Sequence, residues 1–397
     1  MAGRTENIFS LTRMSWVLTL AILLLLVAGV LFVYSSCYVN PEQPVRTLYL
    51  KQVMWALVGL MCYLIFAMID YHKLGTLSWW AYAVCILLLV LVLFIGKRIY
   101  GARRWLMLFG IGIQPSEFAK VAVVIVLANV LSQPGLDFRN VKVIGLILTI
   151  VALPVFLIMK EPDLGTAMIF VPTAMVMLFV AGMPIKTLVY MVVMAVVVVL
   201  LLLGVLFLPG KLGLSQGTQD RFREMTGISE YQKKRIEVFL NPSKDPRGAG
   251  WNKRQSEIAV GSGKTWGRGW TKGKQNMLGF LPRSVAPTDF IYSVIAEEAG
   301  FVGSMAVLFL FSVIVTTGLM TAVASWDQVG RLLCVGIVAM LFCHAFINIS
   351  MTVGLMPITG LPLPLLSYGG SFMVVMMSAL GIVQSVRIRS RHVESFR

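Results

Sequence analysis

Long apolar runs recur along most of the sequence, and this pattern restricts the fold more than any other feature. A run of 18 or more apolar residues is long enough to cross the hydrocarbon core of a bilayer as a helix. Only 13% of the 397 residues are charged, against about a quarter in soluble domains, and the mean hydropathy is +0.83. The sequence therefore predicts an all-α polytopic membrane protein.

Ten transmembrane helices are predicted. The first is not followed by a small-residue cleavage site, so we expect it to be retained rather than removed as a signal peptide. The ten predicted spans are Met14–Tyr34, Tyr49–Ile69, Leu77–Ile95, Glu117–Leu131, Val141–Met159, Leu164–Ala181, Ile185–Leu208, Asp289–Thr321, Leu332–Leu355 and Tyr368–Val386.

An even number of spans places both termini on one side of the membrane. Basic residues at both ends assign that side to the cytoplasm: Arg4, Arg13, Arg387, Arg389, Arg391 and Arg397. The loops then alternate, and the connections at 97–104, 160–163, 209–288 and 356–367 face outward. We treat residues 1–397 as a single membrane domain with one large extracytoplasmic loop, 209–288.

This large loop is strongly basic. It holds fifteen Lys and Arg residues and six acidic residues, an excess of nine positive charges out of sixteen for the chain. Two interpretations stay open: attraction to anionic lipid head groups, or recognition of an anionic substrate carrying a phosphate or diphosphate. A nucleic-acid partner is not expected, because the loop faces away from the cytoplasm.

The loop also contains GSGKT, 261–265, which partly resembles a phosphate-binding loop. The full pattern requires a glycine at the position occupied by Ile258. Nucleotide binding is therefore not predicted here. The five scattered cysteines form no CxxC pair, and for His344 and Asn348 we expect interhelical hydrogen bonds rather than metal binding.

Ionisable residues within or beside spans are costly and therefore mark candidate functional sites. Glu117 and Lys120 are three residues apart on one helix face, and Asp289 opens the eighth span. Helix capping is the alternative role for Asp289. Glu297 and Glu298, two turns further on, are expected deeper in the membrane and away from the outer-face residues, which are Arg103, Arg104, Lys160, Glu161 and Asp163.

The segment MPITGLPLPLLSYGGS, 356–371, contains three prolines within eight residues. No regular helix tolerates that density of proline. Irregular backbone at membrane depth occurs where it lines a cavity, so we expect a broken segment beside a site.

Several stretches together resemble the SEDS family of bacterial cell-wall synthesis, which comprises RodA, FtsW and SpoVE. The resemblance extends from Gly101 to Val386 and rests on GARRWL, IQPSEFAK, EPDLGTAM, GRGWTKGKQNMLGFLP, TDFIYSVIAEEAGFVG and GLPLPLLSYGGS. The PDLGTA and GW-x-KG-x-Q patterns are more similar to the RodA branch than to FtsW. Pro287 departs from the histidine usual in the family, and the Pro282–Asp289 interval is longer.

The resemblance implies a peptidoglycan glycosyltransferase. Such an enzyme polymerises lipid II by inverting transfer at the outer face of the bacterial cytoplasmic membrane, during cell elongation. Its partners would be a class B penicillin-binding transpeptidase and the elongation machinery. The implied catalytic residues are Asp289, Lys120 and Glu117, and the candidate substrate-binding residues are Arg103, Arg104, Asp163, Lys274, Gln275, Ser367 and Ser371.

Three alternatives remain: a lipid II flippase, a division-specific polymerase of the FtsW type, and a scaffold that only holds the transpeptidase. No cofactor is required by the residues. A divalent cation is compatible with a diphosphate leaving group, although no ligand cluster in the sequence demands one.

Overall fold

A computed structural model describes residues 13–38, 47–99, 102–108, 111–211, 230–246, 248–282 and 285–390. Arg4, Arg391 and Arg397, used above to orient the chain, lie outside these ranges. The elements are α1 Trp16–Tyr38, α3 Leu48–Met68, α4 Tyr71–Thr76, α5 Ser78–Ile95, β1 Lys97–Ile99, β2 Ala102–Leu108, β3 Ile111–Ile113, α6 Pro115–Leu131, α7 Val141–Lys160, α8 Leu164–Val180, α9 Ile185–Lys211, α11 Glu230–Leu240, the 3-10 turn η2 Pro242–Lys244, α12 Ala249–Ser262, α13 Lys274–Met277, α14 Ile291–Ala324, α15 Gln328–Thr352 and α16 Gly370–Ser390.

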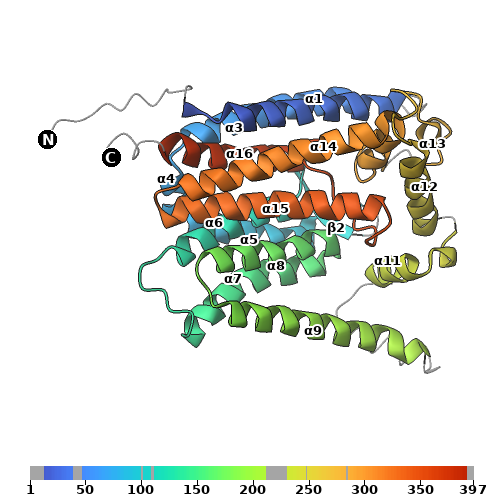
Figure 1. The fold of residues 1–397 in the computed structure, drawn as a ribbon. Helices are drawn as coiled ribbons and strands as arrows, with labels where there is room; N and C mark the ends of the chain where they lie inside the picture. Colours follow the sequence, from blue (N-terminus) through green and yellow to red (C-terminus); the bar gives the residue numbers. More distant parts are fainter. Residues whose placement is uncertain are drawn as a thin grey trace.

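Each of the ten predicted spans corresponds to one long helix. Eight of these helices are long and apolar enough to cross a membrane, and α6 and α8, with 17 residues each, complete the set. The helices lie side by side in one bundle (Figure 1). Because α6, α15 and α16 are the most enclosed, their polar residues face protein rather than lipid, whereas α9 is almost entirely exposed from Ile185 to Val205.

The connection between α5 and α6 contains strands that the sequence pattern did not predict. β1, β2 and β3 pair antiparallel in chain order, with Lys97 opposite Trp105 and Leu106 opposite Ile113. This small sheet lies at the same end of the bundle as α11, α12 and α13 (Figure 1). Its middle strand carries Arg104 to that end.

The helix α14 bends at Gly300, whose backbone has φ +68° and ψ −161°. Only glycine adopts this conformation without strain. The turns before the bend pack against the loop that precedes α14 and against the end of α1: Gln275 N donates to Glu297 at 3.0 Å, and Ser35 Oγ of α1 donates to Glu298 at 2.6 Å. The two glutamates therefore contact this loop and α1 rather than the Asp289 site, and their depth in the membrane stays a prediction.

The Pro/Gly-rich segment between α15 and α16 is non-helical from 353 to 369, as predicted. Hydrogen bonds from its backbone and from Asn348 of α15 hold it against the residues that precede α14. The Asn348 amide donates to the carbonyls of Asp289 and Leu361 at 2.9 and 2.6 Å, and Tyr368 N donates to Pro287 O at 2.8 Å. The broken segment and the Asp289 region therefore form one fixed unit.

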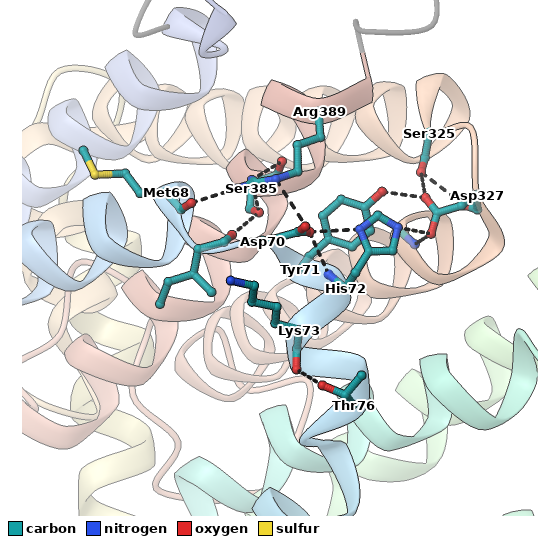
Figure 2. A network of polar contacts seen from close by, with 12 residues as sticks. Met68, Asp70, Tyr71, His72, Lys73, Thr76, Ser325, Asp327, Ser385 and Arg389 are labelled. Carbon is teal, nitrogen blue, oxygen red and sulfur yellow. Dashed lines mark hydrogen bonds and ion pairs between the residues drawn. The ribbon is translucent and has the colours of Figure 1, made fainter. Parts of the chain in front are cut away.

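A separate polar network closes the opposite end of the bundle (Figure 2). The His72 ring lies between Asp70, at 2.9 Å, and Asp327, at 3.6 Å, and Tyr71 donates to Asp327 at 2.7 Å. Arg389 donates to the carbonyl of Met68 at 2.7 Å. The alternation of loops predicted above puts the connections near 72–73 and 327–331 on the same side as the termini, and in the structure these two connections lie together.

Candidate active site

Asp289 lies in the turn before α14, and its side chain does not cap the helix. The N-cap residue of α14 is Phe290, and no side chain caps this helix end. The carboxyl group lies instead beside the Thr288 hydroxyl and within electrostatic range of Arg235, Arg104 and Asp163. The capping interpretation is therefore rejected, and the carboxylate remains available for chemistry.

Burial raises the pKa of Asp289 above its ordinary value, while Arg235, the Thr288 hydroxyl and Arg104 act in the opposite direction. A carboxylate with a raised pKa is a stronger base than a solvated aspartate. The environment of Asp289 thus suits proton abstraction near neutral pH.

Arg235 approaches Asp289 from α11 in the large loop. Both side chains lie next to Gly360. A Cβ atom added to Gly360 would be 3.5 Å from Nη2 of Arg235 and 3.3 Å from Oδ2 of Asp289. Gly360 has φ +74°, in the left-handed region that favours glycine. A side chain at this position would intrude between the guanidinium and the carboxylate.

Asp163, in the turn between α7 and α8, and Arg104, on β2, form the second side of the site. Asp163 caps α8 through Thr166 N at 3.2 Å, and also accepts from the Gln114 amide at 3.2 Å. Arg104 Nη1 lies 3.9 Å from Asp163, and its other nitrogens donate to the carbonyls of Glu161 and Pro162. The turn is thereby fixed in place with its carboxylate facing the same region as Asp289.

Close packing explains the glycine in the EPDLGTAM motif. A Cβ on Gly165 would lie 2.9 Å from Leu361 and 3.0 Å from Thr359, both in the broken segment. Contacts shorter than about 3 Å between carbon atoms are repulsive. Glycine here lets α8 pack directly against the broken segment that carries Gly360.

Glu117 and Lys120 form a buried ion pair on α6. Their atoms Oε2 and Nζ are 2.9 Å apart, and both side chains are almost fully buried. His344 on α15 completes the group, because its Nε2 lies 2.6 Å from the lysine Nζ. The ammonium donates to this nitrogen, which fixes His344 as the tautomer protonated at Nδ1.

This cluster belongs to the same electrostatic unit as Asp289. Asp163 interacts electrostatically with Glu117 and Lys120 on one side and with Asp289 on the other. Lys120 Nζ also lies 5.6 Å from the centre of the Phe372 ring. The residues predicted from three separate motifs are therefore brought together.

Other predicted substrate-binding residues have different surroundings. Arg103 donates to the carbonyls of Leu93 and Phe94 and is bound to the end of α5. Ser367 Oγ donates to Thr288 O and accepts from Leu363 N at 2.7 Å. These two residues therefore hold the scaffold rather than offer free groups to a ligand.

Lys274 and Gln275 lie on α13, against Glu297 rather than Asp289. Six residues of helix separate Glu297 from Ile291, where α14 begins just after Asp289, about 9 Å at a rise of 1.5 Å per residue. The structure does not bring these two residues to the Asp289 site. Ser371, in contrast, is buried next to Phe372, and its hydroxyl lacks a partner within the described residues.

Three further site residues escaped the sequence analysis. Arg235 was one cation among fifteen in the loop, and no local pattern distinguishes it. Glu161 was noted only as a charged residue next to Asp163. His344 was expected to make a hydrogen bond, but its partner Lys120 is 224 residues away and cannot be inferred from one sequence.

Glu161 has an unusual environment. Its side chain is 1% exposed, and neither carboxyl oxygen has a hydrogen-bond partner within the described ranges. Burial, and next the negative charge of Asp163, raise the pKa of Glu161 to about 9, whereas Arg104 lowers it. The side chain is therefore a neutral acid at pH 7.

This shift predicts a pH-dependent stability. Between pH 4.5 and about pH 9, Glu161 keeps its proton in the folded protein, whereas the unfolded chain has lost it. The free energy of unfolding therefore falls as pH rises through this range. Glu161→Gln removes this dependence. We expect its melting temperature to exceed the parent's by several degrees at pH 8 and to match it at pH 5. Equal differences at both pH values would contradict this, and Glu257→Gln on α12 is the control.

The interpretation of GSGKT as a nucleotide loop is not supported. A phosphate-binding loop precedes its helix, but this stretch begins within the last turn of α12 and follows that helix. Within the described residues, no group of three or more His, Cys, Asp or Glu side chains could hold a metal ion.

The fold and this buried ionisable cluster define a multi-pass membrane protein with a polar site at one end of its bundle. The family model FtsW/RodA/SpoVE, described as "Cell cycle protein", matches residues 15–392. The chain belongs to this family.

Relatives and solved structures agree. The chain is 35% identical to peptidoglycan glycosyltransferase RodA of Treponema pallidum (strain Nichols), over 94% of this chain and 97% of that one. It is 36% identical to peptidoglycan glycosyltransferase MrdB of Escherichia coli (strain K12), over 77% and 76% of the two chains.

The fold matches a chain in a structure described as the structural coordination of polymerization and crosslinking by a peptidoglycan synthase complex. The TM-score is 0.75 at 26% identity, covering 94% of this chain and 97% of that one. Thermus thermophilus rod shape determining protein RodA matches with a TM-score of 0.65, at 26% identity and with 94% and 96% coverage.

Proposed function

We propose that this protein is a peptidoglycan glycosyltransferase that polymerises lipid II into glycan strands. The observation that carries the proposal is the Asp289 carboxylate at the polar end of the bundle. This carboxylate does not cap α14, and it interacts electrostatically with Arg235 and Arg104. Two characterised relatives carry the name peptidoglycan glycosyltransferase over most of this chain's length.

The proposed reaction is a single displacement. Asp289 takes the proton from the 4-hydroxyl of the acceptor sugar, whose oxygen attacks C1 of the donor sugar. The bond from C1 to the diphosphate oxygen breaks, and the lipid diphosphate leaves. One displacement inverts an α-linked donor to a β-1,4 bond and requires one base but no covalent sugar–enzyme intermediate.

The leaving diphosphate requires fixed positive charge as its bond breaks. Arg235 and Arg104 are partly exposed near Asp289 and are suited to direct contact with its oxygens. Lys120 is enclosed by Glu117 and His344, so we assign it an electrostatic role from the floor of the site. Ser371 is a candidate hydroxyl contact. Whether a divalent cation assists is tested by adding a chelator to the assay.

The polar site faces the outer side of the bacterial cytoplasmic membrane in this proposal, with both termini in the cytoplasm. The similarity to a chain of a polymerising and crosslinking synthase complex supports a transpeptidase partner of the class B penicillin-binding type. We assign the chain to the RodA branch and to cell elongation, since RodA and MrdB are among its relatives.

The proposal is tested with the purified chain in liposomes that contain lipid II, alone and with a candidate transpeptidase, by a gel of the glycan products. Polymer ladders are expected. Translocation of lipid II across sealed vesicles without any polymer would favour the flippase alternative instead. A scaffold role predicts no polymer from the chain and normal function for site variants in cells.

A further inference from the structure

A second cluster of cations lies outside the Asp289 site, in the loop between α12 and α13. It lines a pocket of about 560 Å³ formed by residues 262–268, 272 and 274. Four cations surround it: Lys264, Arg268, Lys272 and Lys274. The mechanism proposed above uses none of them.

The backbone of this loop is fixed on the bend of α14. Phe301 N donates to Lys264 O at 2.8 Å, and Arg268 N donates to Glu297 O at 2.9 Å. A Cβ on Gly300 would lie 2.2 Å from Gly267 N, so the two segments are in direct contact. The pocket is therefore preorganised, and a ligand would not have to order it.

Within the described residues, the cations of the pocket form no side-chain ion pairs, and the nearest carboxyl groups, those of Glu297 and Glu298, accept hydrogen bonds from the loop backbone at 271 and 273–275. Within the described residues, the lysines at 264, 272 and 274 have no carboxylate within salt-bridge distance, and Arg268 interacts only at longer range with Glu297. All four side chains are exposed. Helix-dipole compensation at the end of α12 explains Lys264 but not Lys272, which lies on another segment.

The surroundings of the pocket include exposed apolar side chains. Trp266 on its rim is 79% exposed, and the first residues of α14 after the bend, Phe301 and Val302, are exposed and apolar. Tryptophan is enriched where head groups meet the hydrocarbon layer. Exposed tryptophan and apolar side chains beside lysines are typical of the head-group region, where lipid phosphates lie.

We propose that this pocket binds the phosphate of an anionic lipid, at a site separate from Asp289. Lysine ammonium groups hold phosphate oxygens, and Trp266 lies against the acyl-chain boundary. The two sources with this chemistry are a bilayer phospholipid and a polyprenyl diphosphate. The inference does not depend on the polymerisation proposal.

The test is native mass spectrometry of the purified full-length protein, titrated with phosphatidylglycerol, undecaprenyl diphosphate or zwitterionic phosphatidylcholine. We expect retention of an anionic lipid, weakened about tenfold or more in Lys264→Gln/Lys272→Gln, since two charge-assisted contacts are lost. The matched control, Lys97→Gln/Lys160→Gln, removes the same charge outside the pocket. Lys264→Arg/Lys272→Arg should retain binding.

Equal weakening in the control, or unchanged binding in the pocket variant, would overturn the proposal. Displacement of the lipid by millimolar inorganic phosphate would also overturn it, because the site would then recognise a soluble anion. If the pocket variant melts below the parent, Lys272→Gln alone is compared with Lys160→Gln. If the protein retains phosphatidylglycerol, the ligand of the pocket is a bilayer phospholipid. If it retains only undecaprenyl diphosphate, the ligand is a polyprenyl diphosphate.

Discussion

Asp289→Asn is expected to reduce lipid II polymerisation by the purified protein by about 10²–10⁴-fold, the usual contribution of a general base. The amide keeps the size of the side chain but cannot accept the proton of the acceptor hydroxyl. Initial rates of glycan formation in liposomes measure this effect.

The variant should still fold and bind lipid II, because Asp289 holds Asn348 through its backbone carbonyl rather than its carboxylate. The matched control is Glu257→Gln, which neutralises another carboxylate of the outer region and should polymerise at the parental rate. Parental activity in Asp289→Asn would show that another group is the base.

Lys120→Met is expected to have the second-largest effect, on stability as well as activity. It leaves the Glu117 carboxylate buried without its partner, and breaking a buried pair in this way costs about 3–5 kcal/mol. Thermal unfolding in detergent should show a clearly lowered melting temperature, and polymerisation should be severely impaired.

A double variant separates the two effects. Lys120→Met/Glu117→Gln removes the unpaired charge, so most of the lost stability should return. Activity should stay low, because the fixed positive charge near the leaving diphosphate is still missing. Recovery of polymerisation together with stability would assign Lys120 a purely structural role.

The sequence predicted the bundle well because each long apolar run can satisfy its backbone only as a helix in a bilayer. All ten spans were found, and three prolines identified the broken segment. The small sheet was missed because Lys97–Ile113 mixes glycine, charge and aromatic residues without a clear period. The contacts of Glu297 and Glu298 with the loop and with α1 were not predicted, because a bend at Gly300 cannot be distinguished from an ordinary helical glycine in one sequence.

For the site, residues in dense polar motifs were predictable and distant partners were not. Asp289, Glu117, Lys120 and Asp163 each stand out as charges beside apolar runs. Arg235 and His344 complete the site only through tertiary packing. Motifs alone assigned Arg103, Lys274 and Gln275 to the site. Neighbouring positions in one motif can have different roles, since Arg104 faces the site while Arg103 binds the end of α5.

The central claim is that the ionised Asp289 carboxylate is the base for polymerisation, and the pH dependence of the initial rate tests it most directly. The rate of the parent should rise with pH to a plateau, with a midpoint above the ordinary range of an aspartate. Since Arg235 lowers the pKa of Asp289, Arg235→Gln should move this midpoint to higher pH. An identical midpoint in the parent and in Arg235→Gln would contradict the account.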